Sequence, residues 1–303
     1  MEPKTSSPRG NIMIIAATLI WGAGYVAQSA GMYHVAPLTF NAVRFAIGGT
    51  IALGPALFFW KRQISHGADK PVSISKNTIV AGIICGTVLC LAINLQQFGL
   101  TFTTIANASF ITSLYVIMVP IASFICFRKR ASIFVWASVV VAMIGIYFLS
   151  LSGGFTVNLG DILVLLCAIT FTAQILIISH FSPKHNVLAL ASVQFYVVAV
   201  ISLVLAFIFE TPSGTAVLAA APYVLYTGVL SSGVAYILQM KAQKTTDATV
   251  AAVLFSFEGV VAALVGWLAL NQFLTPRGIL GCVLIFIAIM LAQIPVKPKE
   301  VKV

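Results

Sequence analysis

The sequence has few charged residues, and this shortage excludes a water-soluble fold. Only 8% of its 303 residues are charged and 60% are hydrophobic, whereas a soluble domain carries about 25% charged residues. A chain of this composition does not have enough polar side chains to cover a surface that faces water. The composition therefore predicts an all-α polytopic membrane protein, because a bilayer requires a spanning chain to satisfy its own backbone hydrogen bonds.

The chain also lacks the motifs of several functional classes. Its five cysteines all lie in apolar runs and none forms a C-x-x-C pair, so we expect no disulfide framework, no metal site and no cofactor. No G-x-x-x-x-G-K-[ST] loop is present, which argues against direct ATP coupling within this chain. The absence of H-E-x-x-H and G-x-S-x-G argues against an intramembrane enzyme.

What the sequence has instead is a series of long apolar runs. A helix needs about 20 apolar residues to cross the hydrocarbon core of a bilayer. Ten such segments are predicted, at 11–30, 37–60, 77–99, 104–127, 131–151, 159–180, 188–209, 218–241, 246–270 and 275–294. Only short connections separate them, so we expect no soluble domain on either side of the membrane.

The basic residues fall almost entirely on one side of this membrane topology. All of the 17 Lys and Arg residues except Arg44 and Arg277 belong to the tails and to alternate turns. They are Lys4, Arg9, Lys61, Arg62, Lys70, Lys76, Arg128, Lys129, Arg130, Lys184, Lys241, Lys244, Lys297, Lys299 and Lys302. The positive-inside rule then places both termini in the cytoplasm. Because the net charge of +10 is spread over the turns, it does not indicate nucleic-acid binding.

Two parts of the chain resemble each other in sequence. The segment "GNIMIIAATLIWGAGY" from Gly10 aligns with "GDILVLLCAITFTAQI" from Gly160, an offset of 150 residues. Further on, "GTVLCLAINLQQ" from Gly86 aligns with "GVLSSGVAYILQ" from Gly228, an offset of 142. Five spans per half is an odd number, so the halves have opposite orientations in the membrane. Such inverted repeats are typical of secondary transporters, although duplication for packing alone gives the same pattern.

This repeat predicts the domain boundaries. We expect a cytoplasmic tail over 1–10, a first five-helix repeat over 11–151, a second over 159–294, and a cytoplasmic tail over 295–303.

Several motifs resemble one family of transporters. They are "WGAGYVAQ" from Trp21, "RFAIGG" from Arg44, "LTFTTIANASFITSLY" from Leu100, and the long segment "FEGVVAALVGWLALNQFLTPRGILGCVLIFIAIMLA" from Phe257. With the ten spans, they resemble the EamA type of the drug/metabolite transporter superfamily over residues 10–295. Gly259 stands where that family usually has proline, and Gln272 where it usually has an acid.

The resemblance implies a function. Members of this family have ten helices in two inverted repeats and move metabolites, often amino acids or related compounds, across bacterial inner membranes. Many of them are exporters. We therefore expect a multi-pass inner-membrane protein, not an enzyme, that exports a small organic solute by alternating access, with a proton as a candidate coupling ion. The alternatives are a channel or lipid scramblase and, less favoured, an intramembrane enzyme. The sequence does not identify the solute or the oligomeric state.

Aromatic and amide side chains are the first candidates for a substrate cavity. At 1.5 Å per residue, four aromatic residues lie about 15–17 Å into their spans, near the middle of the bilayer. They are the repeat mates Trp21 and Phe171, and the repeat mates Tyr115 and Phe257. Gln28 and Gln174 are further candidates. Ordinary core packing is the alternative role for each aromatic residue.

A second set of polar residues predicts two gates. Asn94 and Gln97 share a helix face near the outer end of their span, and their mates Tyr236 and Gln239 lie near the inner end of theirs. Hydrogen bonding between helices is an equally good explanation.

The charged candidates are Arg44 and Glu258, both inside spans. An intramembrane charge indicates a functional site by default. Glu258 is a candidate for a structural pair, for the coupling proton or for substrate contact. Arg44, about 10 Å below the outer end of its span, is a candidate for structure, for gating or for attracting the substrate. We expect Arg44 to pair with an acid or with carbonyl groups inside the bundle.

Overall fold

A computed structural model describes residues 7–65, 75–128, 131–150, 158–270 and 275–294. Seven of its helices are unbroken: α1 (Pro8–Gly31), α2 (Pro37–Ser65), α3 (Lys76–Phe102), α6 (Ile133–Ser150), α7 (Leu159–Phe181), α8 (Val187–Phe209) and α14 (Pro276–Ala292). The other elements form three discontinuous crossings. These are α4 (Ile105–Thr112) with α5 (Tyr115–Phe127), then α10 (Ala221–Leu225), the π-helix η1 (Tyr226–Ala235) and α11 (Tyr236–Ala242), and last α12 (Ala248–Phe255) with α13 (Phe257–Leu270). The short α9 (Gly214–Ala219) precedes α10.

These crossings confirm the predicted fold class. Eight helical segments are long and apolar enough to span a membrane, and α6 and α14 supply two shorter apolar helices. With 17 residues, α14 is about 26 Å long, close to the roughly 30 Å of a hydrocarbon core. All the regular elements in the described ranges are helical.

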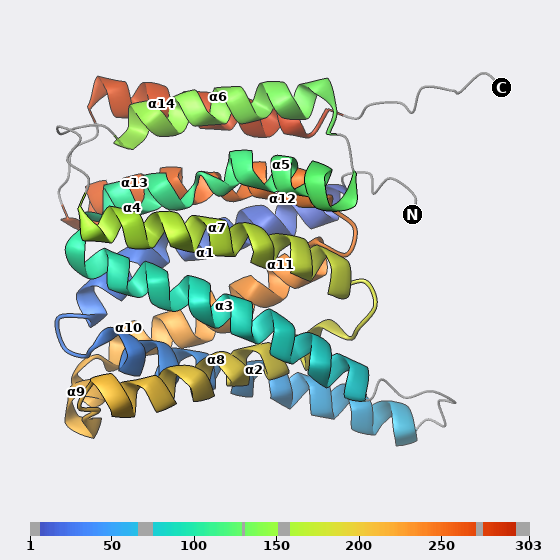
Figure 1. Cartoon of the computed structure of the whole chain (residues 1–303), viewed down its shortest axis with the longest axis vertical. Helices are drawn as coiled ribbons and strands as arrows, with labels where there is room; N and C mark the ends of the chain where they lie inside the picture. Colours follow the sequence, from blue (N-terminus) through green and yellow to red (C-terminus); the bar gives the residue numbers. More distant parts are fainter. Residues whose placement is uncertain (1–6, 66–74, 129–130, 151–157, 271–274, 295–303) are drawn as a thin grey trace.

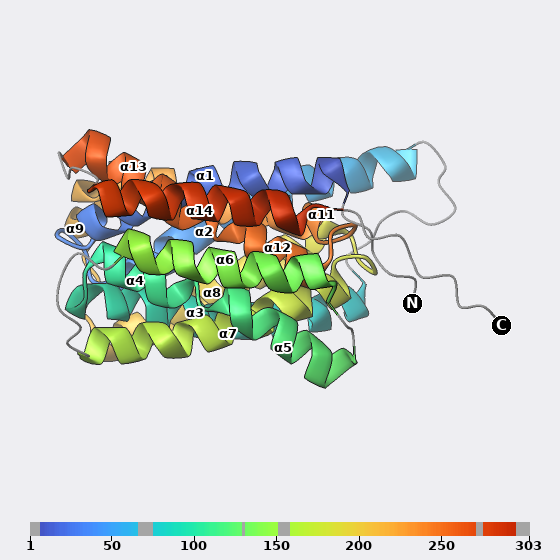
Figure 2. The ribbon, with the colours of Figure 1, turned by 90° about the horizontal axis from the view of Figure 1, so that it is seen from above.

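The helices are arranged around a pseudo-symmetric centre (Figure 1). The repeat mates α6 and α14 pack together at one edge of the bundle, and the mates α2 and α8 pack together at the opposite edge. Between these pairs lie α1, α3, α7 and the discontinuous crossings. Figure 2 shows that α1 begins at the end of the bundle where α14 finishes, whereas α7 begins at the opposite end. The two halves therefore run in opposite directions.

The outer surface of the bundle is apolar along its length. Large hydrophobic side chains point outward from α2, α3, α6, α8 and α14, including Phe58, Ile83, Val140, Phe207 and Phe286. A continuous apolar surface of this kind is unstable in water and is suited to lipid. The protein is thus a multi-pass membrane protein.

Glycines let helices of the two halves approach closely. A Cβ atom at Gly82 would lie 2.6 Å from Cβ of Val193, and one at Gly86 would lie 2.7 Å from the carbonyl oxygen of Gln194. Gly82 and Gly86 on α3 are four residues apart, the small-x-x-x-small spacing of tight membrane helix pairs. This contact fixes α3 against α8.

A carboxylate joins the two mated helices α2 and α8. At the end of α8, Glu210 accepts hydrogen bonds from the backbone N–H groups of Leu38 and Thr39, at 2.8 and 2.9 Å. These N–H groups lie in the first turn of α2 and have no partner within their own helix. The carboxylate also complements the helix dipole there, so Glu210 holds the start of α2.

The turn between α7 and α8 contacts the start of α3 at the other end of the bundle. Nδ1 of His185 lies 3.1 Å from Oγ1 of Thr78. Burial is the main cause that lowers the pKa of His185, and the positive charge of Lys184 is the smaller one. The ring is therefore neutral at pH 7.

Part of the predicted topology falls outside the described residues. This applies to Lys4, Lys70, Lys129, Arg130, Lys297, Lys299, Lys302 and Gln272, and to the tail 295–303.

The glycine contact predicts a difference between two leucine substitutions. Gly86→Leu places a side chain against the backbone of α8 and costs about 1–3 kcal/mol of stability. A Cβ atom at Gly54 on α2 would meet no atom within 4 Å, so we expect Gly54→Leu to leave the stability unchanged. The thermal unfolding of both purified variants in the same detergent is the measurement. Equal unfolding temperatures would contradict the close α3–α8 contact.

Candidate functional site

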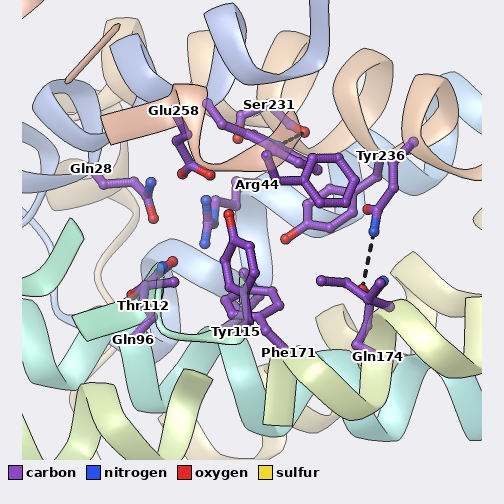
Figure 3. Close-up of a pocket in the computed structure, with 15 residues that line it drawn as sticks. Gln28, Arg44, Gln96, Thr112, Tyr115, Phe171, Gln174, Ser231, Tyr236 and Glu258 are labelled. Atoms are coloured by element: carbon purple, nitrogen blue, oxygen red, sulfur yellow. Dashed lines mark hydrogen bonds between the residues drawn. The ribbon is translucent and has the colours of Figure 1, made fainter. Parts of the chain in front are cut away.

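A cavity lies at the centre of the bundle, where the discontinuous crossings meet α1, α2, α3 and α7 (Figure 3). Its lining consists of Trp21, Gln28, Arg44, Ile93, Gln96, Thr112, Tyr115, Phe171, Gln174, Ile175, Ser231, Tyr236, Gln239, Phe255 and Glu258. The space open to the centre of a water molecule is about 40 Å³, which is enough for on the order of three waters. A larger solute therefore requires the lining side chains or helices to move.

Two of the helix breaks at this cavity are repeat mates. Between α4 and α5, the Ser113 hydroxyl donates to the carbonyl of Ser109 at 2.8 Å. Between α12 and α13, the Ser256 hydroxyl donates to the carbonyl of Val253 at 2.6 Å. Serine side chains that bond to the preceding turn compete with the helical ladder and bend helices. Tyr115 follows the first break and Phe255 precedes the second, and both line the cavity.

The third discontinuous crossing contains the π-helix η1, and α1 is bonded to it. Nε1 of Trp21 donates to the main-chain carbonyl of Ser231 at 3.2 Å, and the hydroxyl of Tyr226 donates to the carbonyl of Ile20 at 3.0 Å. Because π-helical segments are rare and frequently mark functional sites, η1 is a second indication that the site lies here.

Aromatic rings form one wall of the cavity. The ring centroid of Trp21 lies 4.9 Å from that of Tyr236 and 5.6 Å from that of Phe255, and Phe255 also contacts Tyr115 at 6.5 Å. The rings are tilted or edge-on, the arrangements that aromatic quadrupoles favour. The cluster provides an apolar surface next to polar groups.

Arg44 brings a buried positive charge to the cavity. Its side chain is only 1% exposed, and its Nε donates to the side-chain carbonyl of Asn41 at 2.8 Å. The partner is thus a carbonyl, as one form of the prediction had it, and not an acid. The guanidinium carbon lies 5.0 Å from the ring centre of Phe45, within cation–π range.

Glu258 brings the opposite charge from the first turn of α13. It lies beside the hydroxyl of Tyr25, which is its hydrogen-bonding neighbour. The same hydroxyl accepts a hydrogen bond from Nε2 of Gln96 at 3.0 Å. Figure 3 shows the carboxyl group of Glu258 pointing into the cavity. The side chains of Gln28 and Arg44 point into it as well.

Side-chain amides complete the polar lining. Gln239 donates to Gln174 at 3.2 Å, a bond between α11 and α7 that is drawn in Figure 3. Gln28 donates to the carbonyl of Gly24. Oε1 of Gln28, Nε2 of Gln174 and Oε1 of Gln239 are buried and have no partner among the described residues. These atoms are available to bind a polar solute.

The structure brings most of the predicted site residues into this one cavity. Those that line it are Trp21, Gln28, Arg44, Tyr115, Phe171, Gln174, Tyr236, Gln239 and Glu258. Tyr236 and Gln239, predicted at a gate, are therefore part of the cavity wall.

Three predicted residues lie elsewhere. Phe257 packs against the hydrophobic core beside the cavity, because the break at Ser256 directs Phe255 inward instead. Asn94 bonds to Asn41 and Ser202 away from the cavity lining. Gln97 is fully buried on α3 and is also absent from the lining.

Sequence reasoning missed Ile93, Gln96, Thr112, Ile175, Ser231 and Phe255. Gln96 sits beside Gln97, but the choice of the helix face through Asn94 and Gln97 excluded it. Ser231 had a signal in the small-residue run "SSG" within a predicted span.

Discontinuous helices around a mid-bundle polar cavity define a class, the membrane carriers built from repeats. Comparisons with known proteins specify the family. The EamA-like transporter family model matches residues 8–151 and again 158–293. This chain belongs to the EamA-like transporter family, within the drug/metabolite transporter superfamily.

Individual relatives agree with this assignment. A protein of Archaeoglobus fulgidus that is named as a transporter is 33% identical over 278 residues, which is 92% of this chain and 83% of that protein. The transporter YoaV of Bacillus subtilis is 26% identical over 90% of this chain and 92% of its own. A solved crystal structure superposes with a TM-score of 0.76 at 18% identity, covering 96% of this chain and 99% of that one, and so shares the fold. A general transporter role follows.

The cavity wall predicts unequal effects of two phenylalanine substitutions. Phe255 is 2% exposed and contacts Trp21 and Tyr115, so Phe255→Ala costs about 3 kcal/mol and reduces solute flux. Phe257 is only partly buried and lies outside the lining, so Phe257→Ala retains most of the flux per folded molecule. Flux in liposomes, normalised to folded protein, is the measurement. A larger flux loss for Phe257→Ala would show that the assigned cavity wall is wrong.

Proposed function

We propose that this protein is a secondary transporter that moves a small organic metabolite across the membrane by alternating access. One observation carries the proposal: a polar and aromatic cavity lies at mid-bundle, and the crossings around it are discontinuous and come from both repeats. Irregular backbone at membrane depth is tolerated where it lines a cavity or is buried in protein. Such a site at the repeat interface is where secondary transporters bind their solutes.

The inverted repeats supply the mechanism. Each half contributes a broken crossing to the cavity, α4–α5 from the first and α12–α13 from the second. If the two halves exchange conformations, the cavity opens to the other side of the membrane without loss of its lining. The symmetry is incomplete at α2, because Arg44 lines the cavity while its repeat mate Gln194 does not. That difference makes the two openings chemically unequal.

The lining supports an amino-acid-like solute. It combines the aromatic wall around Trp21 with amide groups that have unused hydrogen-bonding atoms and with two charged residues. A solute with an apolar part and polar ends satisfies all of these groups. Export from the cytoplasm of a bacterial cell, with both termini cytoplasmic, is the direction that the family resemblance and the positive-inside rule favour.

Glu258 is the candidate for ion coupling. It is the carboxyl group in the lining, and its hydrogen-bonding neighbour is the hydroxyl of Tyr25. Proton carriers in membranes are typically carboxylates in such positions. A proton on Glu258 in one orientation of the cavity, released in the other, would link solute movement to the proton gradient.

Counterflow separates this proposal from its alternatives. A thermal-shift screen of the purified protein against metabolites identifies a solute, because a ligand that favours the folded state raises its stability. In liposomes preloaded with that solute, we expect saturable uptake of the labelled form and transient accumulation above equilibrium. Flux that rises linearly without saturation would indicate a channel, and lipid exchange between leaflets would indicate a scramblase.

The coupling role predicts the effect of neutralising Glu258. Glu258→Gln keeps the size and hydrogen-bonding capacity of the side chain but removes its titration. We expect transport driven by a pH gradient to fall at least about tenfold, and to fall by more than solute counterflow without a gradient does. The matched control is Asp161→Asn, which changes a helix-capping carboxylate outside the cavity. Unchanged pH-driven transport in Glu258→Gln would remove the proton from the mechanism.

A further inference from the structure

Glutamine side chains join α7 to α11 on one side of the cavity. Gln239 of α11 donates to the side-chain carbonyl of Gln174 on α7 at 3.2 Å. One turn further along, Nε2 of Gln243 donates to the main-chain carbonyl of Ile175 and to the hydroxyl of Ser179, both at 3.1 Å. Hydrogen bonds between polar side chains of neighbouring helices hold membrane helices together. These bonds therefore connect the two halves of the chain below the cavity.

The same contacts continue to one end of the bundle. The hydroxyl of Ser182, directly after α7, donates to the main-chain carbonyl of Met240. The start of α1 lies at this end too, because a Cβ atom at Gly10 would lie 3.4 Å from the carbonyl oxygen of Ala242. The positive-inside rule assigns this end to the cytoplasm. The α7–α11 bonds thus lie between the cavity and that end.

The repeat mate of Gln239 is buried and has no hydrogen-bond partner. At the offset of 142 residues, Gln97 on α3 aligns with Gln239. Its side chain is fully buried, and neither its Nε2 nor its Oε1 has a partner among the described residues. A buried amide that lacks its bonds costs free energy. Gln97 is therefore suited to a second conformation in which its amide is bonded.

Gln28 on α1 provides a matching amide. The repeat mate of Gln174 is Gly24, which has no side chain, but Gln28 lies one turn further along the same face of the helix. Its Nε2 donates to the carbonyl of Gly24 at 3.3 Å, and its Oε1 is buried without a partner among the described residues. Figure 3 shows Gln28 and Gln174 at opposite ends of the cavity. Gln28 thus has the place at one end that Gln174 has at the other.

We propose that two glutamine pairs act as alternate gates of the cavity. Gln174 and Gln239 close it toward the end where α1 begins, and Gln28 and Gln97 close it toward the opposite end once the two halves have exchanged conformations. This proposal rests on the proposed alternating access and names the residues that close each side. In the structure the first pair is bonded and the amide of Gln97 is not. Neutral amides suit a gate, because such bonds between membrane helices are weak enough to break in each cycle.

The reactivity of a cavity cysteine from each side of the membrane tests the gates. The reactive site is Ser231→Cys, at a residue of the cavity lining. Cys126→Ala and Cys282→Ala accompany it, because these two native cysteines are not buried whereas the other three are. A membrane-impermeant methanethiosulfonate is applied to right-side-out and to inside-out vesicles. The ratio of the two labelling rates measures which side of the cavity is open, and no solute is needed.

Two glutamine variants are expected to shift this ratio in opposite directions. Gln239→Met keeps the length of the side chain but removes the amide, so labelling from the side where α1 begins rises about threefold relative to the other side, the effect of losing one bond between membrane helices. Gln97→Met removes a bond that forms only in the exchanged conformation, and it shifts the ratio the other way. Gln194→Met is the matched control. Gln194 is fully buried, lacks partners among the described residues and lies outside the lining, so its substitution leaves the ratio unchanged.

The partner of each glutamine supplies a second variant. We expect Gln174→Met to reproduce the shift of Gln239→Met, and Gln28→Met to reproduce that of Gln97→Met. Each double variant shifts the ratio no further than its single variants, because both members belong to one bond. The test therefore remains decisive if one of the single variants does not fold.

The outcomes separate the gates from the transport proposal. Shifts in the same direction for Gln239→Met and Gln97→Met, or ratios equal to that of Gln194→Met, would overturn the gates. Saturable counterflow together with such ratios would leave the transporter role standing. Absence of saturable flux for every solute would remove the transporter role, and the labelling ratio would still decide whether the glutamine pairs are gates.

Discussion

Inside a bilayer, a chain has to satisfy its own backbone hydrogen bonds, and this constraint organises the whole molecule. Most of the crossings meet it with unbroken helices whose outward faces are apolar. Three crossings do not, and all three are interrupted beside one cavity. There, serine hydroxyls and the Trp21 side chain bond to main-chain carbonyls at or next to the irregular segments. The irregular backbone is stable only because surrounding helices shield it from lipid.

The same constraint explains where charge is placed. A guanidinium or carboxylate facing lipid costs several kcal/mol, so Arg44 and Glu258 both turn inward. Each is held by neutral neighbours, Arg44 by Asn41 and Glu258 by Tyr25. The close helix contacts at glycines, such as Gly22 of α1 against the carbonyl of Glu258, set the distances between these supports. A charged side chain that neutral neighbours hold in place, without a counter-charge, is suited to binding a ligand reversibly.

Much of this architecture was predictable from the sequence, for physical reasons. The apolar runs indicated helices because they are continuous over about 20 residues, whereas a barrel strand needs only about 10 residues and alternates in polarity. The odd number of runs per repeat required inverted halves. Arg44 and Glu258 stood out because charged residues inside spans are rare. The mid-span aromatics Trp21, Tyr115 and Phe171 stood out because depth follows directly from helical rise.

The rest depended on geometry that a regular helix does not have. Counting residues along an ideal helix placed Phe257 inward, but the break at Ser256 turns Phe255 inward in its place. The choice of one face of α3 favoured Asn94 and Gln97 over Gln96, and only the packing of α3 against α7 and α8 decides between those faces. The π-helix η1 likewise depends on tertiary contacts, including the bond from Trp21 to Ser231.

The central claim is that the two halves alternate around a single cavity, and a pair of distances tests it most directly. Spin labels on Thr104 and Ser213 report on the end of the bundle formed by the α3–α4 and α8–α9 turns. Labels on Ser132 and Lys184 report on the opposite end. Double electron–electron resonance measures the distance between the two labels of each pair. The measurement is made in liposomes, with and without the solute that counterflow identifies. The account predicts that one distance grows as the other shrinks. Two distances that stay fixed during saturable transport, or that open together, would contradict it.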